Sequence, residues 1–348
     1  MADVTDAAFR RIIAKYSKNL DVEFPSDDLE TRRPSRDGPD VMWTEFVSVD
    51  GLCSPGREVL LRDFLYTEAE RPIVAQIFGS KPDNFYTVAK LIKKLGFDGI
   101  DINMGCPDKN VERQGGGAAM IKSPELAQKV IHAAQEGGDG LPVSVKTRVG
   151  FNRVELEAWI PKLLETKIAA VTVHARTRKE MSNVPARWGY VKEVVEIAKG
   201  SGTLVIGNGD VKDLDDARMK AAETGADGIM LGRAIFGNPW LFRGESLALP
   251  ARPKSDVGGK GLSSEKTGSD LRIQPTLEEK LRVMVEHTKL FHELLGDIKN
   301  FAVMKKHFKA YVNGFDGAKE LRMKLMETET PEEVEQIVAR WLSGVRQH

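Results

Sequence analysis

Short apolar runs that are typical of strands alternate with amphipathic runs that are typical of helices over roughly the first two thirds of this 348-residue chain. The strand-like runs are Val41–Phe46, Ile73–Phe78, Gly99–Asn103, Val143–Arg148, Ala170–His174, Thr203–Gly207 and Gly228–Leu231. The helix-like runs between them include Asn84–Leu95, Pro124–Ala134, Glu155–Leu164, Tyr190–Ala198 and Leu214–Thr224. This alternation predicts parallel strands joined by helical crossovers, which is an α/β architecture.

The seven strand-like runs are one fewer than a closed (β/α)8 barrel contains. The chain begins with what resembles the loop and helix that follow a first strand, Thr5–Tyr16. We therefore predict a TIM barrel whose first strand is truncated to Met1 and Ala2. An open doubly wound sheet is the alternative, but such sheets usually carry G-x-G-x-x-G after the first strand, and no such motif opens a helix here.

Two stretches interrupt the strand–helix rhythm. The segment Asp21–Asp40 is rich in Asp, Arg, Pro and Ser, which is typical of a surface insertion. The segment Arg252–Gln274 is rich in Gly, Ser, Lys and Asp and is typical of a flexible linker. Helical patterns follow it at Thr276–Leu295, Lys299–Asn313, Ala318–Met326 and Pro331–Leu342. We predict a barrel domain over residues 1–248, a linker over 249–275 and a small all-helical domain over 276–348.

Composition excludes several classes of protein. Two cysteines are too few for a disulfide framework and favour a reducing compartment, so we expect a cytoplasmic protein. No apolar run is long enough to span a membrane, and the first residues lack the apolar core of a secretory signal. No Cys-x-x-Cys or His-x-x-x-His pair predicts a metal site, and no Gly-x-Ser-x-Gly motif predicts a serine hydrolase.

Polar side chains mark the ends of several predicted strands. Asn103 ends one strand and Cys106 lies in the turn that follows, while Gln76, Lys146 and His174 occur at or near the ends of three others. Each of these residues taken alone is more readily explained as a solvated strand end. Parallel α/β enzymes, however, place their chemistry at the carboxyl ends of their strands, so the set together favours one shared site.

Side-chain direction strengthens this prediction. Lys146 and Arg148 are two residues apart, as are His174 and Arg176, so each pair points to one side of its strand. If those sides face the barrel mouth, a thiol, an amide, an ammonium group and an imidazole converge there.

The last two predicted strands are followed by phosphate-binding signals. Asn208, Gly209 and Asp210 follow one strand, and Gly232 and Arg233 follow the next. Loops at these positions of a TIM barrel commonly bind phosphate through backbone N–H groups, and an arginine adds a charged hydrogen bond. Either turn alone is an ordinary glycine turn; the two together favour a phosphate site.

The C-terminal helical segment is basic although the whole chain has a formal net charge of zero. Residues 299–324 contain seven basic and two acidic residues, a local net charge of +5, with Lys305 and Lys306 adjacent. On composition alone a solvated basic helix face is the more common explanation. A grip on the phosphate backbone of RNA is the functional alternative.

These residues together resemble the tRNA-dihydrouridine synthase family of flavoenzymes. The matching segments are MADVTDAAFR, GPDVMWTEFVSVDGL, QIFGSKPDNF, GFDGIDINMGCPDKNVERQGGGAAMIKSP, VSVKTRVGF, VTVHARTR, IGNGDV and GADGIMLGRAIFGNPWLF. The tail MKKHFKAYVNGFDGAKELRMKLMETET is similar to that family's RNA-binding domain. The resemblance covers most of the chain outside Asp21–Asp40 and Arg252–Gln274, and its Gly-Cys-Pro segment is highly specific.

The resemblance implies an FMN cofactor across the barrel mouth and NADPH as reductant. The cofactor-binding residues that it implies are Met1, Ala2, Gln76, Lys146, His174, Asn208, Gly209, Asp210, Gly232 and Arg233. Met1 and Ala2 are the remainder of a family strand that ends in Pro-Met-Ala and whose backbone meets the flavin.

The resemblance also implies the reaction, which is reduction of the C5–C6 double bond of uridine in tRNA. Cys106 is the expected general acid at C5. The expected substrate-binding residues are Asn103, Arg176, Lys305 and Lys306. Arg187 stands where many members carry an Asp, so no role is assigned to it. tRNA is the expected partner, and we expect a monomer with no metal and no membrane attachment.

Two alternatives remain open at this point. One is an FMN-dependent barrel reductase of a free pyrimidine, similar to a dihydroorotate dehydrogenase, against which the basic helical tail argues. The other is a catalytically inactive RNA-binding paralogue without flavin, although the presence of Cys106, Lys146 and His174 gives no sign of decay.

Overall fold

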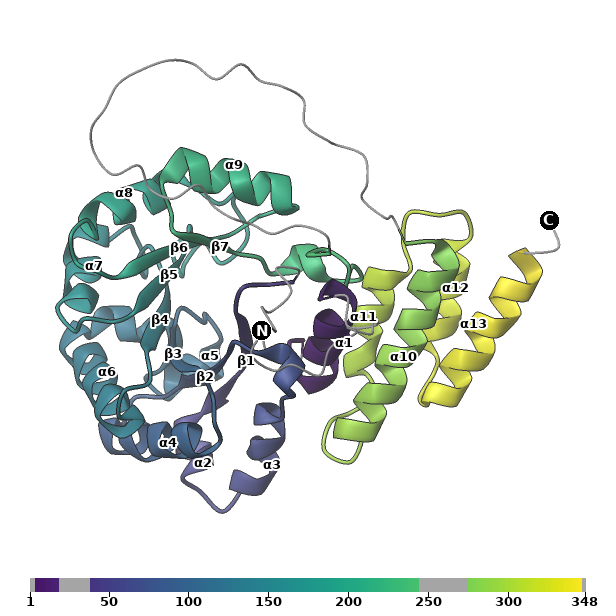
Figure 1. Ribbon diagram of the computed structural model, residues 1–348, viewed down its shortest axis with the longest axis horizontal. Helices are drawn as coiled ribbons and strands as arrows, with labels where there is room; N and C mark the ends of the chain where they lie inside the picture. Colours follow the sequence, from purple (N-terminus) through teal and green to yellow (C-terminus); the bar gives the residue numbers. More distant parts are fainter. Residues whose placement is uncertain (1–3, 19–37, 244–274, 346–348) are drawn as a thin grey trace, which may run out of the picture.

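The computed structural model describes residues 4–18, 38–243 and 275–345 of the chain. Within these residues the strands form one parallel seven-stranded sheet in the order β1 to β7, so each strand pairs with its sequence neighbours. The strands are β1 (Met42–Ser48), β2 (Ile73–Phe78), β3 (Gly99–Met104), β4 (Val143–Arg148), β5 (Ala170–His174), β6 (Leu204–Asn208) and β7 (Gly228–Met230). The sheet curls around an axis with helices on its outside (Figure 1). The predicted α/β barrel class is confirmed.

The longer helices that follow the strands cover the outer face of this sheet, and shorter ones lie in the loops after β1 and β3 (Figure 1). In chain order they are α2 (Val49–Leu52), α3 (Arg57–Leu61), α4 (Pro82–Lys94), α5 (Lys109–Arg113), α6 (Pro124–Gly138), α7 (Leu156–Leu164), α8 (Gly189–Ile197) and α9 (Leu214–Thr224). Short 3-10 turns lie at η1 (Arg62–Phe64), η2 (Glu68–Glu70), η3 (Gly117–Lys122) and η4 (Arg233–Ile235). The predicted strands and helices all have counterparts here, with bounds that differ by a few residues.

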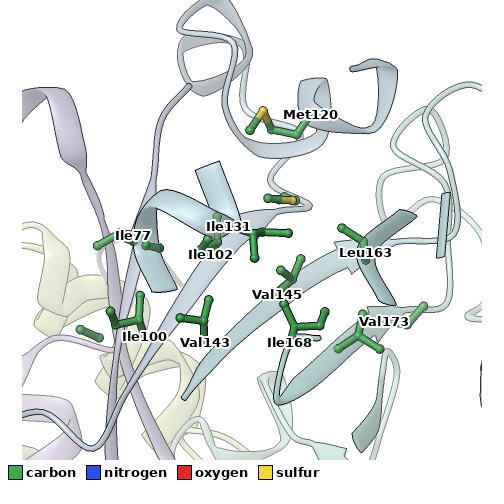
Figure 2. Packing of buried hydrophobic residues seen from close by; sticks show 14 of the residues in the cluster. Ile77, Ile100, Ile102, Met120, Ile131, Val143, Val145, Leu163, Ile168 and Val173 are labelled. Atoms are coloured by element: carbon green, nitrogen blue, oxygen red, sulfur yellow. The ribbon is translucent and has the colours of Figure 1, made fainter. Parts of the chain in front are cut away.

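Alternation along the central strands separates an apolar outer face from a polar inner face. Ile100, Ile102, Val143 and Val145 pack in the buried cluster that also contains side chains of α6 and α7 (Figure 2). Because successive side chains of a strand point to opposite faces, the residues between them turn to the inside of the curl. Polar residues such as Asp101, Asn103 and Lys146, which alternate with these apolar residues, therefore lie on the inner face.

The described strands do not close the curl, because β1 pairs only with β2 and β7 only with β6. The predicted remnant of a first strand, Met1 and Ala2, lies outside the described residues. Helix α1 (Ala7–Ser17) lies on the side of the sheet that faces the C-terminal helices (Figure 1). Its Asp6 cap accepts a hydrogen bond from the backbone N of Phe9 at 2.9 Å, which fixes where the helix begins.

The C-terminal helices form a second cluster that packs against α1. They are α10 (Leu277–Leu295), α11 (Val303–Tyr311), α12 (Ala318–Met326) and α13 (Pro331–Val345). Phe9 and Ile13 of α1 belong to the barrel core, whereas Ala8 and Ile12 belong to the core of the C-terminal helices. The two cores thus share one helix. Residues 249–274 of the predicted linker lie outside the described residues, as does most of the predicted insertion.

Polar and steric contacts also join the helical unit to the barrel. Lys299 makes ion pairs with Glu45 of β1 and Asp63 of η1, the latter at 2.8 Å, and only 14% of its side chain is exposed. Despite its partial burial, the two carboxylates raise its pKa. At Gly237, which has φ +69°, a Cβ atom would overlap the carbonyl oxygen of Ala310 in α11. Lys299 lies outside α11, so the predicted helix Lys299–Asn313 begins later than expected.

Candidate active site

Strand register brings the predicted site residues to neighbouring positions. Asn103 of β3 pairs with Lys146 of β4. Arg148 of β4 pairs with His174 of β5, which pairs in turn with Asn208 of β6. Because all these strands are parallel, their carboxyl ends meet at one rim of the sheet, which we call the barrel mouth. The predicted convergence of an amide, an ammonium group and an imidazole is therefore present.

The turn that carries Cys106 is tightly hydrogen-bonded. The side-chain oxygen of Asn103 accepts the backbone N–H groups of Gly105 at 3.1 Å and Cys106 at 3.0 Å. The carbonyl of Cys106 accepts the N–H of Ala118 at 2.9 Å. At Gly117, which has φ +58°, a Cβ atom would lie 2.7 Å from that carbonyl oxygen, so only glycine fits. The Cys106 thiol is half-buried, and this burial raises its pKa.

Asn103 keeps part of its amide available. Its oxygen is used by the Cys106 turn, whereas its Nδ2 donates to no residue in the described part of the chain. The side chain is 6% exposed. Asn103 therefore supports the turn and can still donate hydrogen bonds to a ligand.

Gln76 is held by a buried network that extends across three strands. Its Nε2 donates to Asp101 of β3 at 2.7 Å, and Ser144 of β4 donates to the other oxygen of Asp101 at 2.6 Å. Burial raises the pKa of Asp101, which the hydrogen bonds from Ser144 and Gln76 oppose. With its NH2 group facing Asp101, the Gln76 Oε1 is left as an acceptor for a donor from a ligand.

Lys146 lies on the inner face of β4 and is oriented by β6. Its Nζ donates to Asn208 Oδ1 at 3.3 Å, and Asn208 Nδ2 donates to the carbonyl of Met230 at 2.8 Å. Burial, with the positive charge of Arg148 in second place, lowers the pKa of Lys146 to about 8. The ammonium group is therefore poorly solvated, and although the charge of Asp101 acts on it, it forms no ion pair among the described residues, which favours binding of an anionic group beside it.

His174 is neutral and in a defined tautomer. The always-charged Arg176 donates through Nη1 to His174 Nε2 at 2.9 Å, so the imidazole proton resides on Nδ1. Burial lowers the pKa of His174 to about 2, and the neighbouring charges of Lys146 and Arg148 act in the same direction. His174 therefore presents an N–H donor without a positive charge of its own.

Arg176 is 2% exposed, and its three nitrogens all contact protein groups. Besides His174, it donates to the carbonyl of Val184 at 2.6 Å and forms an ion pair with Asp210. The pattern predicted that Arg176 and His174 share one side of the sheet, and the structure agrees. Arg176 thus connects the loop after β5, through Val184, to the turn after β6, through Asp210.

Asp210 joins the two predicted phosphate loops. Its carboxylate accepts Arg233 Nη2 at 2.6 Å and the backbone N–H of Ala186 at 2.8 Å, in addition to Arg176. Burial opposes ionisation, but the hydrogen bonds from Ala186 and Arg176 keep the pKa of Asp210 below its usual value. The ion pair between Asp210 and Arg233 thus joins the turn after β6 to the turn after β7.

The turn at Gly209 fits closely against the imidazole. Gly209 has φ +125°, and a Cβ atom there would lie 2.9 Å from Ala186 Cβ and 3.2 Å from His174 Cδ2. A larger residue would therefore displace either the loop or the imidazole.

Arg148 is a site residue that the predicted set left out. It is 6% exposed and donates to the carbonyl of Gly105 at 2.7 Å and to those of Thr177 and Met181 at 3.0 Å and 2.9 Å. Burial lowers its pKa to about 10. The two-residue spacing from Lys146 already placed it on the inner face, so alternation could have identified it. Asp101 is signalled in the same way, by its position between Ile100 and Ile102.

The remaining predicted residues lie elsewhere. Met1 and Ala2 are outside the described residues. Lys305 is half-buried and Lys306 exposed on α11, in the helical unit. Lys299 of the same basic segment is instead buried against Glu45, so the basic surface is smaller than the composition suggests.

The barrel mouth carries an excess of positive charge. Lys146, Arg148, Arg176 and Arg233 all act on His174, which is itself neutral. Asp210 neutralises part of this charge. Such a surplus, together with a thiol, an amide and an imidazole N–H, fits an anionic ligand that also offers hydrogen-bonding groups.

Two further classes of site are not found in the part of the chain that the structure describes. Within residues 4–18, 38–243 and 275–345, no group of three or more His, Cys, Asp or Glu side chains is arranged to hold a metal ion. Nor does any helix of these segments have the length and apolar character needed to cross a bilayer.

Comparison with known proteins identifies close relatives. A model of the dihydrouridine synthase family (Dus) matches residues 1–343. The "Probable tRNA-dihydrouridine synthase 2" of Bacillus subtilis (strain 168) is 35% identical over 99% of this chain and 94% of its own length. The "Probable tRNA-dihydrouridine synthase" of Staphylococcus aureus (strain MRSA252) is 34% identical over 95% of this chain and 88% of its own length.

Solved structures of more distant proteins align with part of this chain. Histamine dehydrogenase from Rhizobium sp. 4-9 has a TM-score of 0.47 and 15% identity, covering 68% of this chain and 42% of its own. Morphinone reductase has a TM-score of 0.43 and 12% identity, covering 69% of this chain and 81% of its own. These likenesses are too distant to bear on function. The family match and the two bacterial relatives agree with the resemblance drawn from the motifs, and the chain belongs to the dihydrouridine synthase family.

Proposed function

We propose that this chain is an FMN-dependent tRNA-dihydrouridine synthase that uses NADPH to reduce the C5–C6 double bond of uridine in tRNA. One observation carries the proposal: in a chain of this family, a structured thiol turn stands at the same rim as Lys146 and neutral His174. The printed names of the two bacterial relatives support tRNA as the substrate.

The residues at the barrel mouth fit a flavin phosphate. Asn208, Gly209 and Asp210 would offer the turn after β6, and Gly232 and Arg233 the turn after β7. The excess positive charge around His174 supports a phosphate at these turns. The resemblance adds the backbone of Met1 and Ala2 as proposed contacts of the flavin itself.

The same rim fits the ring of the flavin. In the proposal the Gln76 Oε1 accepts an N–H of the ring, because its amide NH2 is occupied by Asp101. Lys146 would stabilise negative charge on the reduced ring; burial and the charge of Arg148 lower its pKa, and an anionic ring would offset both effects. His174 would donate a hydrogen bond through its Nδ1–H group to an acceptor on the ring, since its Nε2 accepts from Arg176.

The chemistry that FMN would supply when held by these residues and reduced by NADPH is a hydride for C6 of the uracil ring. Cys106 supplies the other hydrogen, as a proton from its thiol to C5, and the resulting thiolate regains a proton from water. The raised pKa of Cys106 keeps the thiol protonated at neutral pH, as an acid requires. Hydride and proton together balance the saturation of one double bond.

The chain's other residues hold the base in place for this step. Asn103 Nδ2 would donate to a uracil carbonyl, because it has no acceptor among the described residues. Arg176 would contribute to substrate binding by holding the loop after β5 in place through its hydrogen bond to the carbonyl of Val184. Correct placement of donor, acid and base supplies much of the rate in such reactions.

The C-terminal helices would hold tRNA while its target base leaves the stack. Lys305 and Lys306 are the proposed phosphate contacts on α11. We propose a barrel domain over residues 1–248, a linker over 249–275 and an RNA-binding domain over 276–348. We also propose that the enzyme is monomeric and cytoplasmic. Since α1 belongs to both cores, the helical unit should be tested in the intact chain.

The test uses the purified full chain with FMN, NADPH and a tRNA transcript that carries no modification. We expect dihydrouridine in the digested product, detected as the mass of two added hydrogens. Turnover of a free pyrimidine without tRNA would favour the small-molecule reductase instead. Protein that binds tRNA but takes up no FMN and stays colourless would favour the inactive paralogue.

A further inference from the structure

A two-point ion pair links the segment after Cys106 to the loop after β5. Arg178 Nε and Nη2 contact the two carboxylate oxygens of Glu112 in α5, the second at 2.6 Å. The side chains are 24% and 15% exposed, so the pair is partly shielded from water. A paired arrangement of this kind fixes orientation as well as distance.

The Arg178 end of this pair is anchored to the loop after β4. Its backbone N–H donates to the carbonyl of Gly150 at 2.9 Å, and the next residue, Lys179, donates to the carbonyl of Phe151 at 2.9 Å. The guanidinium also lies 5.3 Å from the centre of the Phe151 ring. The position of Arg178 is therefore set by its own backbone and by Phe151.

The Glu112 end belongs to the Cys106 turn. Helix α5 begins after Asp108, whose side chain accepts the backbone N–H of Asn110 at 2.8 Å. The N–H of Glu112 donates to the carbonyl of Asp108 at 3.0 Å. Only a short, hydrogen-bonded stretch thus separates Glu112 from Cys106.

A second arginine ties the other side of the Cys106 turn to the same loop. Arg148 donates to the carbonyl of Gly105 and to that of Thr177. The residue before Cys106 and a helix after it are therefore both connected to the segment 177–181. The turn is held from two directions, one inside the barrel mouth and one at its edge.

We propose that the Glu112–Arg178 pair is a positioning device that holds the Cys106 thiol in the orientation needed for proton transfer. The turnover part of this inference rests on the proposed function, whereas the effect on the thiol itself does not. The two-point contact fixes the orientation of Glu112 relative to the loop after β5, so we assign the pair a role in geometry. Displacement of a reacting group by about 1 Å can lower a rate about a hundredfold.

The test removes the pair in protein whose exposed second thiol is absent. All variants carry Cys53→Ser, so that Cys106 is the single cysteine. The main variant is Glu112→Gln, and Arg178→Lys removes the two-point geometry while keeping the charge. The double exchange Glu112→Arg with Arg178→Glu restores an ion pair. Glu335→Gln, which breaks a 2.7 Å pair with Lys289 between α10 and α13, is the matched control.

Three quantities are measured in each variant: the rate of Cys106 alkylation by iodoacetamide, the FMN affinity, and kcat and KM for tRNA. For Glu112→Gln we expect kcat to fall about tenfold with KM and FMN affinity unchanged. We expect alkylation to rise by about threefold or more, because the loosened thiol is better solvated. Arg178→Lys should give a smaller change in the same direction, the exchange should recover part of both effects, and Glu335→Gln should give neither.

Unchanged kcat and unchanged alkylation in Glu112→Gln would overturn the inference. So would a loss of kcat that follows a loss of folded protein, as judged by circular dichroism, with no change in the alkylation rate of the folded fraction. If the Cys53→Ser parent produces no dihydrouridine, the proposed function fails, and the alkylation rates still decide the role of the pair.

Discussion

Two groups of basic side chains in this molecule differ in how they are held. At the barrel mouth, Lys146 and Arg148 are hydrogen-bonded, and burial lowers the pKa of both. On α11, Lys305 is half-buried, Lys306 is exposed, and neither forms an ion pair with any residue of the described segments. The first group is hydrogen-bonded and poorly solvated; the second has no ion-pair partner in these segments and is more exposed to water.

The difference indicates two kinds of anion recognition in one chain. Cations that have lost water and are held by protein carbonyls and amides favour a particular anion in a particular place. Cations in water attract a phosphate backbone with little regard for sequence, and salt weakens that attraction. We therefore expect the barrel mouth to decide cofactor and chemistry, and α11 to contribute general affinity for RNA.

The largest effect is expected from the acid that stands beside the barrel-mouth cations. Cys106→Ala should retain FMN and its reduction by NADPH but lower dihydrouridine formation by about 10²–10⁴-fold, because the proton donor is lost. The exposed thiol variant Cys53→Ser should behave as wild type. A Cys106→Ala protein that fails to bind FMN would assign this cysteine to folding instead of catalysis.

A second large effect is expected from Lys146→Met. Loss of the ammonium group should lower turnover by about 10²–10³-fold, because charge on the reduced ring is no longer stabilised. The control is Lys93→Met. Lys93 lies near the C-terminal end of α4 and pairs with Asp139, which follows α6. Equal turnover in both variants would contradict the role assigned to Lys146 in stabilising charge on the reduced ring.

The pH dependence of FMN binding should distinguish Lys146 from His174. Since the pKa of Lys146 is about 8, its charge is lost above that pH, and FMN affinity should fall by up to about tenfold per pH unit there. For stability the sign is opposite. The pKa in the folded state lies below the ordinary lysine value of 10.5, so the Lys146 contribution to the free energy of unfolding rises as pH increases between these values.

His174 should contribute no inflection near its ordinary value. Its pKa of about 2 keeps it neutral throughout the working range. Fluorescence titrations of FMN between pH 5 and pH 9 check both expectations, with Lys146→Met as the variant that should lack the alkaline inflection (~pH 8). An inflection near pH 6.5 that disappears in His174→Gln would contradict the assigned tautomer and charge.

The smallest effect is expected from the solvated lysines. Lys305→Ala and Lys306→Ala should each raise KM for tRNA by about threefold at physiological salt and reduce the salt slope by about one, with kcat unchanged. Lys289→Ala, which removes a lysine already paired with Glu335, is the control. A fall in kcat at saturating tRNA would mean that α11 takes part in more than general RNA affinity.

The sequence contained most of the barrel, because its strands are apolar runs bounded by turns and its helices are amphipathic. The same alternation placed Lys146 on the inner face, and it equally signalled Asp101 and Arg148. The carboxyl-end rule for parallel strands then grouped Gln76, Cys106, Lys146 and His174 at one rim. Local pattern was sufficient for these features because each depends on the direction of a single strand.

Features that depend on contacts between distant segments were not predictable in this way. Arg176 is buried between His174 and Asp210, which follows from the shape of two loops. Lys299 was counted with the basic surface, but the docking of the helical unit places it against Glu45. Helix α1 serves two hydrophobic cores, and an amphipathic pattern does not state how many partners a helix has.

In the proposed function the Cys106 thiol and the barrel-mouth cations Lys146 and Arg148 surround one ligand. This claim is tested most directly by alkylating Cys106 in the Cys53→Ser protein with and without FMN. We expect saturating FMN to slow alkylation about tenfold or more, because the bound cofactor narrows access to the thiol from one side, and we expect adenosine monophosphate at the same concentration to have no effect. FMN that binds tightly and leaves the alkylation rate unchanged would contradict the claim.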